Sequence, residues 1–547
     1  MMKMYDKVVT AAEAVSKIPD NAFLAVAGIN VAGTPLELLD ALVDRYNNEG
    51  HPKDIDLTNS GNNAGISRLA VEGMLRVYYA GFPAMDHRNP EGGFTGNNVI
   101  PVFHFTQGIG TQFYRAQASG VPYLTKAPIG TYVDPRLDGA CANDKAREFS
   151  KENPIVKIVE ISGQEYLHID LPPVTVTIFK ATSADTDGNL IDDDENIKNE
   201  ILPMALAAHN NGGIVIAQVN NLLEPGQIDG ADVRVPGMLV DYIVVCSDQK
   251  KWAPQNVLMF RPPEATGLKP GKTGYEIGIT GHYRVSRETI DFDIIKPSGT
   301  RMMMARRAIT ELWPGCVANI GMGVPTGIPY IAAMEEINDM YYQTVELGAI
   351  GGFTGGVGLF GAAYNARSYL KHDEMFSFID GQGLDIAILG AGEVGEDGTV
   401  NVTRVGGMTI GSGGFVSISA NTHKLVFLCT HTTGGKSEIV DGKLNIVSQG
   451  KPTKFVKQVE QVGFNGKDAV KRGQDVTYVT ERAVFKLIDG KLTLVEFAPG
   501  LDVEKDILSM MEFRPEVSPD LKPIPDYCFN VEQIGMKEEW KKLLEEM

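Results

Sequence analysis

Cysteine is scarce in this sequence, and its spacing forms no pattern. Only five cysteines occur among 547 residues, and they stand far apart, at Cys141, Cys246, Cys316, Cys429 and Cys528. The odd count and the lack of any Cys-x-x-Cys pair argue against a disulfide framework. Such sparing use of cysteine fits a protein of the reducing cytosol.

Basic residues are also in deficit. Lysine and arginine total 50 against 69 for aspartate and glutamate, which leaves a net charge of −19. An acidic surface repels phosphate backbones, so we expect no nucleic-acid partner. The acidic residues are spread along the chain rather than gathered in a tail, as on a solvated surface.

Membrane-spanning runs are missing as well. The N-terminal sequence MMKMYDKVVTAAEAVSKIPD contains no apolar signal core. Three long stretches carry no charge, but they are too rich in glycine and small polar residues for lipid-facing helices: Gly92–Tyr114, Leu347–Ala366 and Val405–His423. We therefore expect a cytoplasmic protein without membrane contact. The 60 glycines of the chain are concentrated in these stretches, which indicates backbone that something approaches closely.

Length and composition predict a globular protein with more than one domain. At roughly 100–200 residues per domain, this chain has room for about two to four. Apolar residues make up 43% and charged residues 22%, the balance of an ordinary globular protein.

A faint internal repeat organises the chain. In the first half, the apolar run Phe23–Ala27 leads into a glycine turn, Gly28–Gly33, then proline and an amphipathic helix from Leu36. In the second half, Cys316–Ile320 leads into Gly321–Gly327, then proline and the helical pattern YIAAMEEIND. A strand, a glycine-rich turn and a proline near the first helical position predict a strand–helix unit in each half.

Further apolar runs follow in both halves. They are Asp54–Thr58, Val174–Phe179 and Gly213–Val219 in the first half, and Tyr342–Val345, Leu384–Leu389 and Leu425–Thr430 in the second. Continuous apolar strands that alternate with helices are typical of parallel sheets covered by helices. We therefore predict an α/β protein with two homologous open domains and mainly parallel sheets, fused in one chain. The domains would span residues 1–275 and 298–547, joined by a linker at 276–297.

Ligands of such folds have a predictable place. Open parallel sheets bind ligands at the carboxyl ends of their strands, so two copies predict a site in the groove between them. The first domain also carries a long extra segment before Val174.

Two glycine motifs imitate a dinucleotide-binding fingerprint. Gly390–Gly395 and Gly356–Gly361 both satisfy G-x-G-x-x-G. The fingerprint must open a helix, but Gly395 is followed by a turn and β-branched residues, and no strand–turn–helix unit surrounds Gly361. An NAD-dependent oxidoreductase is therefore disfavoured.

Other catalytic and metal motifs are lacking. The sequence has no P-loop and no nucleophile elbow in a strand–turn–helix setting. His104, His423 and His431 have neither the spacing nor the partners of metal ligands, so we expect no metal site.

Glu346 is the outlier among the carboxylates. It follows the predicted strand Tyr342–Val345 and opens the uncharged stretch Leu347–Ala366. A carboxylate in such surroundings must be paired or functional. It is either a helix-capping or salt-bridged glutamate, or a nucleophile strengthened by desolvation among fixed dipoles.

Two segments offer hydrogen-bond donors for such a nucleophile. Gly411–Phe415 would present successive backbone N–H groups, as in an anion-binding nest, although a tight turn or bulge explains it equally well. Gln107, followed by Gly108, offers a side-chain amide, unless it is a surface residue.

Blocks of sequence in both halves match one known family. In the second half they are Val345–Gly352, Gly356–Asn365, Gly383–Gly390, Val400–Gly406, Gly411–Phe415, Thr430–Gly435, Phe464–Gly466 and Val476–Arg482. In the first half they are Gln107–Gly108, Gly130–Arg136, Gly163–Leu167 and Val235–Tyr242. The set resembles the family I CoA-transferases, specifically the fused single-chain propionate/acetate CoA-transferases of the acyl-CoA:acetate/3-ketoacid type. The resemblance covers nearly the whole chain and implies an α-subunit-like half followed by a β-subunit-like half.

The resemblance implies a catalytic role for Glu346, in the family's E-x-G motif. A ping-pong reaction would pass through a glutamyl-CoA thioester, with Gln107, Gly413 and Gly414 as candidate oxyanion donors. The substrates would be acyl-CoA and short-chain carboxylates such as acetate, propionate or butyrate, with no permanently bound cofactor and no metal. Candidate CoA-binding glycines are Gly321, Gly323, Gly348, Gly351 and Gly411. A homo-oligomer, dimer or tetramer, is also implied.

Some positions depart from the pattern of the family. The context of Gln107 is QGIGTQFYRA, and Phe353-Thr354 follows the double glycine after Glu346. These positions would border the acyl pocket, so the acids exchanged stay open. An acyl-CoA hydrolase of the same fold, which would admit water, is the alternative activity, and a non-catalytic metabolite-binding protein is a second.

Overall fold

The computed structural model describes residues 6–29, 32–61, 65–83, 99–246, 296–354, 361–530 and 532–546. The chain forms two compact units. Unit 1 comprises residues 1–282 together with two short segments from the second half of the sequence, Leu370–Ser377 and Met408–Gly414. Unit 2 comprises the remaining residues. The predicted linker at 276–297 lies almost wholly outside the described residues, so the domain boundaries remain a proposal.

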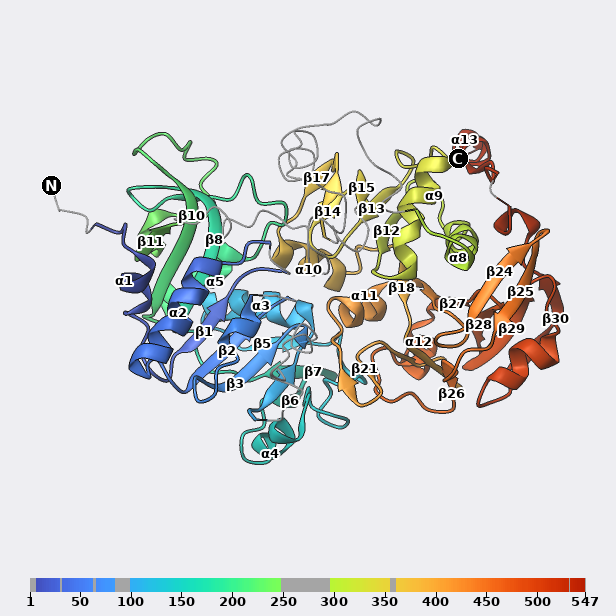
Figure 1. Cartoon of the computed structure of the whole chain (residues 1–547), viewed down its shortest axis with the longest axis horizontal. Coiled ribbons are helices and arrows are strands. Elements are labelled where there is room, and N and C mark those ends of the chain that lie inside the picture. The colour runs from blue at the N-terminus through green and yellow to red at the C-terminus, as the bar shows by residue number, and fades with distance from the viewer. Residues whose placement is uncertain are drawn as a thin grey trace. The chain divides into compact units, whose positions relative to one another are not determined.

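Unit 1 is built on one parallel sheet, drawn in blue and green in Figure 1. Its strands run in the order β11-β10-β8-β1-β2-β3-β4, and all neighbours in this path are parallel. Their bounds are β1 Phe23–Val26, β2 Ile55–Asn59, β3 Leu75–Ala80, β4 Val102–His104, β8 Val176–Asp185, β10 Ile214–Leu223 and β11 Tyr242–Val245. The short β9 (Leu190–Ile191) pairs with β8 in the antiparallel sense.

Helices cover this sheet. They are α1 Ala11–Val15, α2 Leu36–Glu49, α3 Gln107–Ala118 and α5 Ile201–Asn210. Leu38, Leu39 and Leu42 of α2 are fully buried in the core that also holds Leu24 and Val26 of β1. Replacing one of these leucines with alanine costs about 2–5 kcal/mol of stability in typical cores.

The extra segment of the first half is now visible. Between β2 and β8 it supplies β3, β4, α3, the helix α4 (Asp144–Glu152) and a small antiparallel sheet. That sheet has the order β5-β7-β6, with bounds Tyr123–Thr125, Gln164–Ile169 and Val156–Ile161. The segment therefore extends the parallel sheet by two strands and delivers α3, whose first residue is Gln107.

Unit 2 has a mixed sheet in the order β17-β14-β13-β12-β18-β23-β27-β28-β29-β30. The five strands from β13 to β27 are parallel. Their bounds are β12 Val317–Ile320, β13 Tyr342–Thr344, β18 Ile386–Gly390, β23 Lys424–Leu428 and β27 Asp475–Val479. The flanking strands are β14 Ala349–Ile350, β17 Ser368–Tyr369, β28 Ala483–Ile488, β29 Lys491–Phe497 and β30 Glu516–Pro523.

The helices of the second half are α8 Thr300–Ile309, α9 Ile328–Met334, α10 His372–Asp380, α11 Phe415–Asn421, α12 Gly466–Arg472 and α13 Met536–Glu546. Met303 and Ile309 of α8 are buried with Ala318, Ile320 and Ile388 in one core. No helix in the described part of the chain is long and apolar enough to cross a membrane.

The predicted class is confirmed: two α/β domains with mainly parallel sheets. The unit β1–turn–α2 has its counterpart in β12–turn–α9. Helix α9 is shorter than its sequence pattern predicts, because it ends at Met334. The carboxylate of the next residue, Glu335, accepts the backbone N–H groups of Ile534, Gly535 and Met536. This carboxylate thus fastens the start of α13, while α9 ends where Glu336 takes a φ of +56°.

Candidate active site

Glu346 lies in the tight turn that joins β13 to β14. The N–H of Gly348 donates to the carbonyl oxygen of Val345 at 3.0 Å, and the N–H of Val345 donates to Ala349 at 3.2 Å. Gly348 has a φ of +106°, which only glycine adopts at little cost. The turn holds Glu346 at 9% exposure. The turn joins two strands, so the backbone of Glu346 lies between β13 and β14 rather than at the start of a helix.

The carboxyl ends of β13, β12 and β18 meet at one edge of the unit 2 sheet. Glu346 follows β13, Gly321 follows β12, and β18 ends at Gly390. The N–H of Gly321 donates to the carbonyl oxygen of Ile388 on β18 at 2.9 Å. This edge is where open α/β sheets bind ligands. Glu346 and the glycine turn after β12 therefore lie at the same edge of the sheet.

The other predicted glycines of unit 2 shape backbone near this edge. Gly323 has a φ of +94° and precedes the short helical turn Val324–Gly327 that leads into α9. Gly351 has a φ of +71°, and its N–H donates to the carbonyl oxygen of Gln343 on β13 at 2.7 Å. A Cβ atom on Gly351 would come within 2.9 Å of the Arg367 side chain. The structure thus explains why glycine stands at Gly323 and Gly351 without showing a ligand there.

Gln107 and Gly413 are direct neighbours in unit 1. Gln107 is the first residue of α3, and its backbone N–H donates to the carbonyl oxygen of Gly413 at 3.0 Å. The hydroxyl of Thr106 accepts the N–H of Ile109 and caps the same helix end. Gln107 is only 4% exposed, so it is no surface residue. Its Oε1 atom is buried without a hydrogen-bond partner among the described residues.

The segment Gly411–Gly414 is a turn that leads into α11. Gly411 has a φ of +128° and Gly413 a φ of +54°, both in the region that favours glycine. A Cβ atom on Gly411 would come within 2.6 Å of the Phe82 ring. The turn therefore depends on glycine both for its backbone conformation and for its packing in unit 1.

Three residues that hold this turn were not predicted as site residues. The N–H of Ser412 donates to Nε2 of His104 at 2.9 Å, and the hydroxyls of Tyr132 and Ser412 lie 2.8 Å apart. In the sequence, His104 stands out only as a histidine without the spacing of a metal ligand. Tyr132 and Ser412 do lie in the blocks Gly130–Arg136 and Gly411–Phe415, and this was the signal in the sequence.

Helix α3 also packs on a second buried cluster, formed by Ser60, Glu200 and His372. The Glu200 carboxylate accepts hydrogen bonds from the Ser60 hydroxyl and from Nδ1 of His372, the latter at 2.8 Å. Burial alone would raise the pKa of Glu200, but the charge and hydrogen bond of His372 hold that pKa below its usual value. A Cβ atom on Gly110 of α3 would come within 2.7 Å of Ser60 Cα, so the helix rests directly on this cluster.

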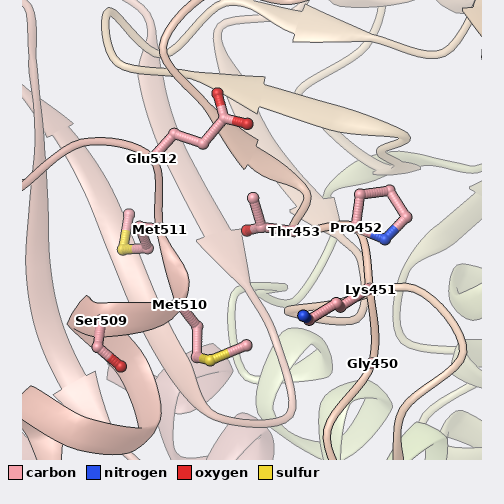
Figure 2. Close-up of a pocket in the computed structure, with 8 residues that line it drawn as sticks. All are labelled: Gly450, Lys451, Pro452, Thr453, Ser509, Met510, Met511 and Glu512. Carbon is pink, nitrogen blue, oxygen red and sulfur yellow. The ribbon is translucent and has the colours of Figure 1, made fainter.

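Unit 2 also contains an open pocket of about 610 Å³, lined by Gly450–Thr453 and Ser509–Glu512. Figure 2 shows the side chains of Lys451 and Met510 pointing toward one another across it. The buried Arg482 guanidinium links the two lining segments. It donates to Gln449 Oε1, just before Gly450, and to the carbonyl oxygen of Asp506, three residues before Ser509. None of the predicted site residues lines this pocket.

The described part of the chain contains no group of three or more histidine, cysteine, aspartate or glutamate side chains that could hold a metal ion.

Comparison with known proteins decides the family. Residues 8–246 match the family described as Coenzyme A transferase. Caffeate CoA-transferase of Acetobacterium woodii is 35% identical, and the alignment covers 97% of this chain and 98% of that protein. The chain belongs to the coenzyme A transferase family. Acetate CoA-transferase YdiF of Escherichia coli K12 is 38% identical over 95% of each chain.

Solved structures agree with this assignment. The acyl-CoA transferase YdiF apoenzyme from E. coli O157:H7 matches with a TM-score of 0.85 at 34% identity, over 98% of each chain. Its thioester complex with CoA matches with a TM-score of 0.84 at 34% identity, over 96% of this chain and 97% of that one. The protein is thus a fused, single-chain CoA-transferase.

Proposed function

We propose that this CoA-transferase moves CoA from a short-chain acyl-CoA to an acceptor carboxylate through a glutamyl-CoA thioester on Glu346. The observation that carries the proposal is the position of Glu346. It is a nearly buried carboxylate in a turn at the carboxyl edge of a parallel sheet, followed by uncharged, glycine-rich backbone. Desolvation of this kind makes a carboxylate a better nucleophile.

The first half-reaction has two steps. A Glu346 carboxylate oxygen attacks the thioester carbonyl, the carbon–sulfur bond breaks, and CoA leaves as the thiolate with an acyl-glutamyl anhydride remaining. The thiolate then attacks the Glu346 carbonyl, the anhydride carbon–oxygen bond breaks, and the free acid leaves. An acceptor carboxylate reverses both steps. No net proton is transferred, and a thiol with a pKa of about 8.5 is an adequate leaving group without a dedicated acid.

Hydrogen-bond donors would stabilise the oxyanions of these steps. We assign this role to the Gln107 side-chain amide and to the backbone N–H groups of Gly413 and Gly414. Loss of one such donor costs about 10²–10³ in kcat in well-studied enzymes. In support, unit 1 holds Gln107 against Gly413 by a backbone hydrogen bond.

CoA itself would be bound by backbone. We assign Gly321, Gly323, Gly348, Gly351 and Gly411 as glycines at which CoA approaches the main chain. Four of the five have a positive φ, and the fifth, Gly321, directly follows β12. The relatives named above act on acetate and caffeate, and for this enzyme we propose acetate, propionate or butyrate.

Assembly and location complete the proposal. We propose a cytoplasmic homo-oligomer, a dimer or tetramer. All five cysteines are free and buried, which suits a reducing compartment.

The test is steady-state CoA transfer between propionyl-CoA and acetate, with varied concentrations of both. A ping-pong enzyme gives parallel lines in double-reciprocal plots, and Glu346→Gln abolishes transfer. Steady release of free CoA without any acceptor would instead indicate an acyl-CoA hydrolase. Intersecting lines would contradict the covalent intermediate.

A further inference from the structure

The turn Gly411–Gly414 comes from the second half of the sequence, yet it is fastened in unit 1 at three points. The hydroxyl of Thr409 donates to the carbonyl oxygen of Ala142 at 3.2 Å. The N–H of Ser412 donates to His104 at 2.9 Å, and the carbonyl oxygen of Gly413 accepts from Gln107 at 3.0 Å. Of these three contacts, the one between Ser412 and His104 is made by a histidine ring.

His104 and Gln107 share one short segment of chain. His104 is the last residue of β4, and α3 begins at Gln107. The N–H of His104 donates to the carbonyl oxygen of Ala140 at 2.7 Å, which fixes the backbone on the other side. The His104 side chain, which belongs to this segment, therefore sets the position of Ser412 relative to Gln107.

The ring of His104 is held for this contact. It stacks on the ring of Tyr132, with centroids 4.6 Å apart and planes inclined by 22°. Both residues are 1% exposed. The Tyr132 hydroxyl lies 2.8 Å from Ser412 Oγ and 3.2 Å from His104 Nε2, so one phenol supports both ends of the contact.

The contact also fixes the state of the imidazole. A backbone N–H can only donate, so Nε2 of His104 must offer its lone pair, and the neutral ring then carries its proton on Nδ1. A proton on Nε2 would set two donors against each other. Burial raises the pKa of Tyr132 far above its usual value, so the phenol stays a neutral donor.

We propose that His104 and Tyr132 are positioning residues that hold the Gly413 and Gly414 backbone in register with Gln107. This inference rests on the proposed oxyanion role of those three residues. His104 and Tyr132 act through Ser412 and its neighbours and need not touch the substrate. They set the geometry of the donors during the chemical steps, so they affect kcat more than the KM for acyl-CoA.

The test compares substitutions that remove or keep single atoms. His104→Phe keeps a buried ring but removes the acceptor, and His104→Gln restores an acceptor at about the position of Nε2. We expect His104→Phe to lower kcat about 10–100-fold, in line with the cost of small misplacements of catalytic groups. His104→Gln should recover most of that loss, and the KM for propionyl-CoA should stay within about twofold in both variants.

A double-mutant cycle isolates Tyr132. Tyr132→Phe should lower kcat a few-fold, and the same substitution in a Ser412→Ala background should add clearly less, because the nearer of the two partners of the phenol is already gone. Tyr46→Phe is the matched control. It removes a phenol that donates to the Glu72 carbonyl oxygen at 2.9 Å in the same unit, and kcat should not change.

Three results would overturn the proposal. The first is a His104→Gln variant that is as slow as His104→Phe although it unfolds at the wild-type temperature. The second is full additivity of the effects of Tyr132→Phe and Ser412→Ala on kcat. The third is a KM for propionyl-CoA that rises by the same factor by which kcat falls. The rate at which wild-type enzyme forms its CoA adduct, followed by intact mass, separates this failure from that of the proposed function. A wild-type enzyme that transfers CoA without an adduct on Glu346 overturns both proposals. A wild-type adduct with the wrong variant pattern overturns only the role of His104 and Tyr132.

Discussion

The backbone N–H of Gln107 donates to the carbonyl oxygen of Gly413 across 3.0 Å, although the two residues come from opposite halves of the chain. The bond occupies the main chain of Gln107 and leaves its side-chain amide for another role. It also means that the turn before α11 folds as part of unit 1, whereas α11 itself belongs to unit 2.

Gln107→Ala tests the side chain without breaking this bond. We expect kcat to fall about 10²–10³-fold, the usual cost of losing one oxyanion donor. Gln112→Ala is a matched control on the same helix, because it removes an amide that donates to the Asp373 carbonyl oxygen at 2.6 Å. Both kcat and the thermal unfolding midpoint should be measured. Equal losses of activity in the two variants would argue against a donor role for Gln107.

Gly413→Ala tests the turn. A Cβ atom at a φ of +54° costs about 1–2 kcal/mol in backbone strain. Gly406 has a φ of +59° and open space around its Cα, so Gly406→Ala carries a similar strain at a glycine that is not a proposed donor. We expect similar losses of unfolding free energy in urea, but a large loss of kcat only for Gly413→Ala. Parallel losses of activity would show that backbone strain alone explains the effect.

His431 predicts a pH dependence of stability. Burial, together with the nearby Arg482 guanidinium, lowers the pKa of His431 from 6.5 to about 3. At a pH between the folded and the unfolded pKa of His431, the imidazole is protonated in the unfolded chain but neutral in the folded protein. The contribution to stability is therefore complete above the unfolded pKa and is lost as pH falls toward about 3, by about 1.4 kcal/mol per pH unit.

His431→Gln removes this titration but keeps a donor for the Ile507 carbonyl oxygen, which lies 3.2 Å from Nε2. The free energy of unfolding between about pH 7 and about pH 5 should therefore fall by about 2 kcal/mol less in the variant than in the wild type. Glu481, whose pKa burial raises, titrates in both proteins and cancels in this difference. If the stability of the variant and of the wild type depended on pH in the same way, the buried neutral His431 would not be the cause of the pH dependence.

Local patterns in the sequence predicted much of the fold. The strand–glycine–proline–helix repeat at Phe23 and Cys316 appears as β1–α2 and β12–α9, and Glu346 stands at the end of a parallel strand as predicted. These features depend on neighbouring residues, so periodicity and turn chemistry capture them. The family resemblance added the candidate roles, which remain proposals.

Contacts between distant segments could not be predicted in this way. Nothing near Ser412 indicates that it packs on His104, and nothing near Leu370 indicates that His372 pairs with Glu200. The end of α9 was also misjudged, because Glu336 turns the chain with a φ of +56° and the Glu335 carboxylate binds the distant backbone around Gly535. Each of these bonds joins residues far apart in sequence, where local propensity carries no information.

The central claim is the covalent intermediate on Glu346, and intact-protein mass measures it most directly. Enzyme mixed with propionyl-CoA and no acceptor should gain the mass of a CoA thioester, and peptide mapping should place the adduct on Glu346. Glu346→Gln should bind propionyl-CoA but gain no mass, and acetate should discharge the wild-type adduct as acetyl-CoA. A wild-type enzyme that transfers CoA at full rate without ever gaining this mass, or that carries it on another residue, would contradict the account.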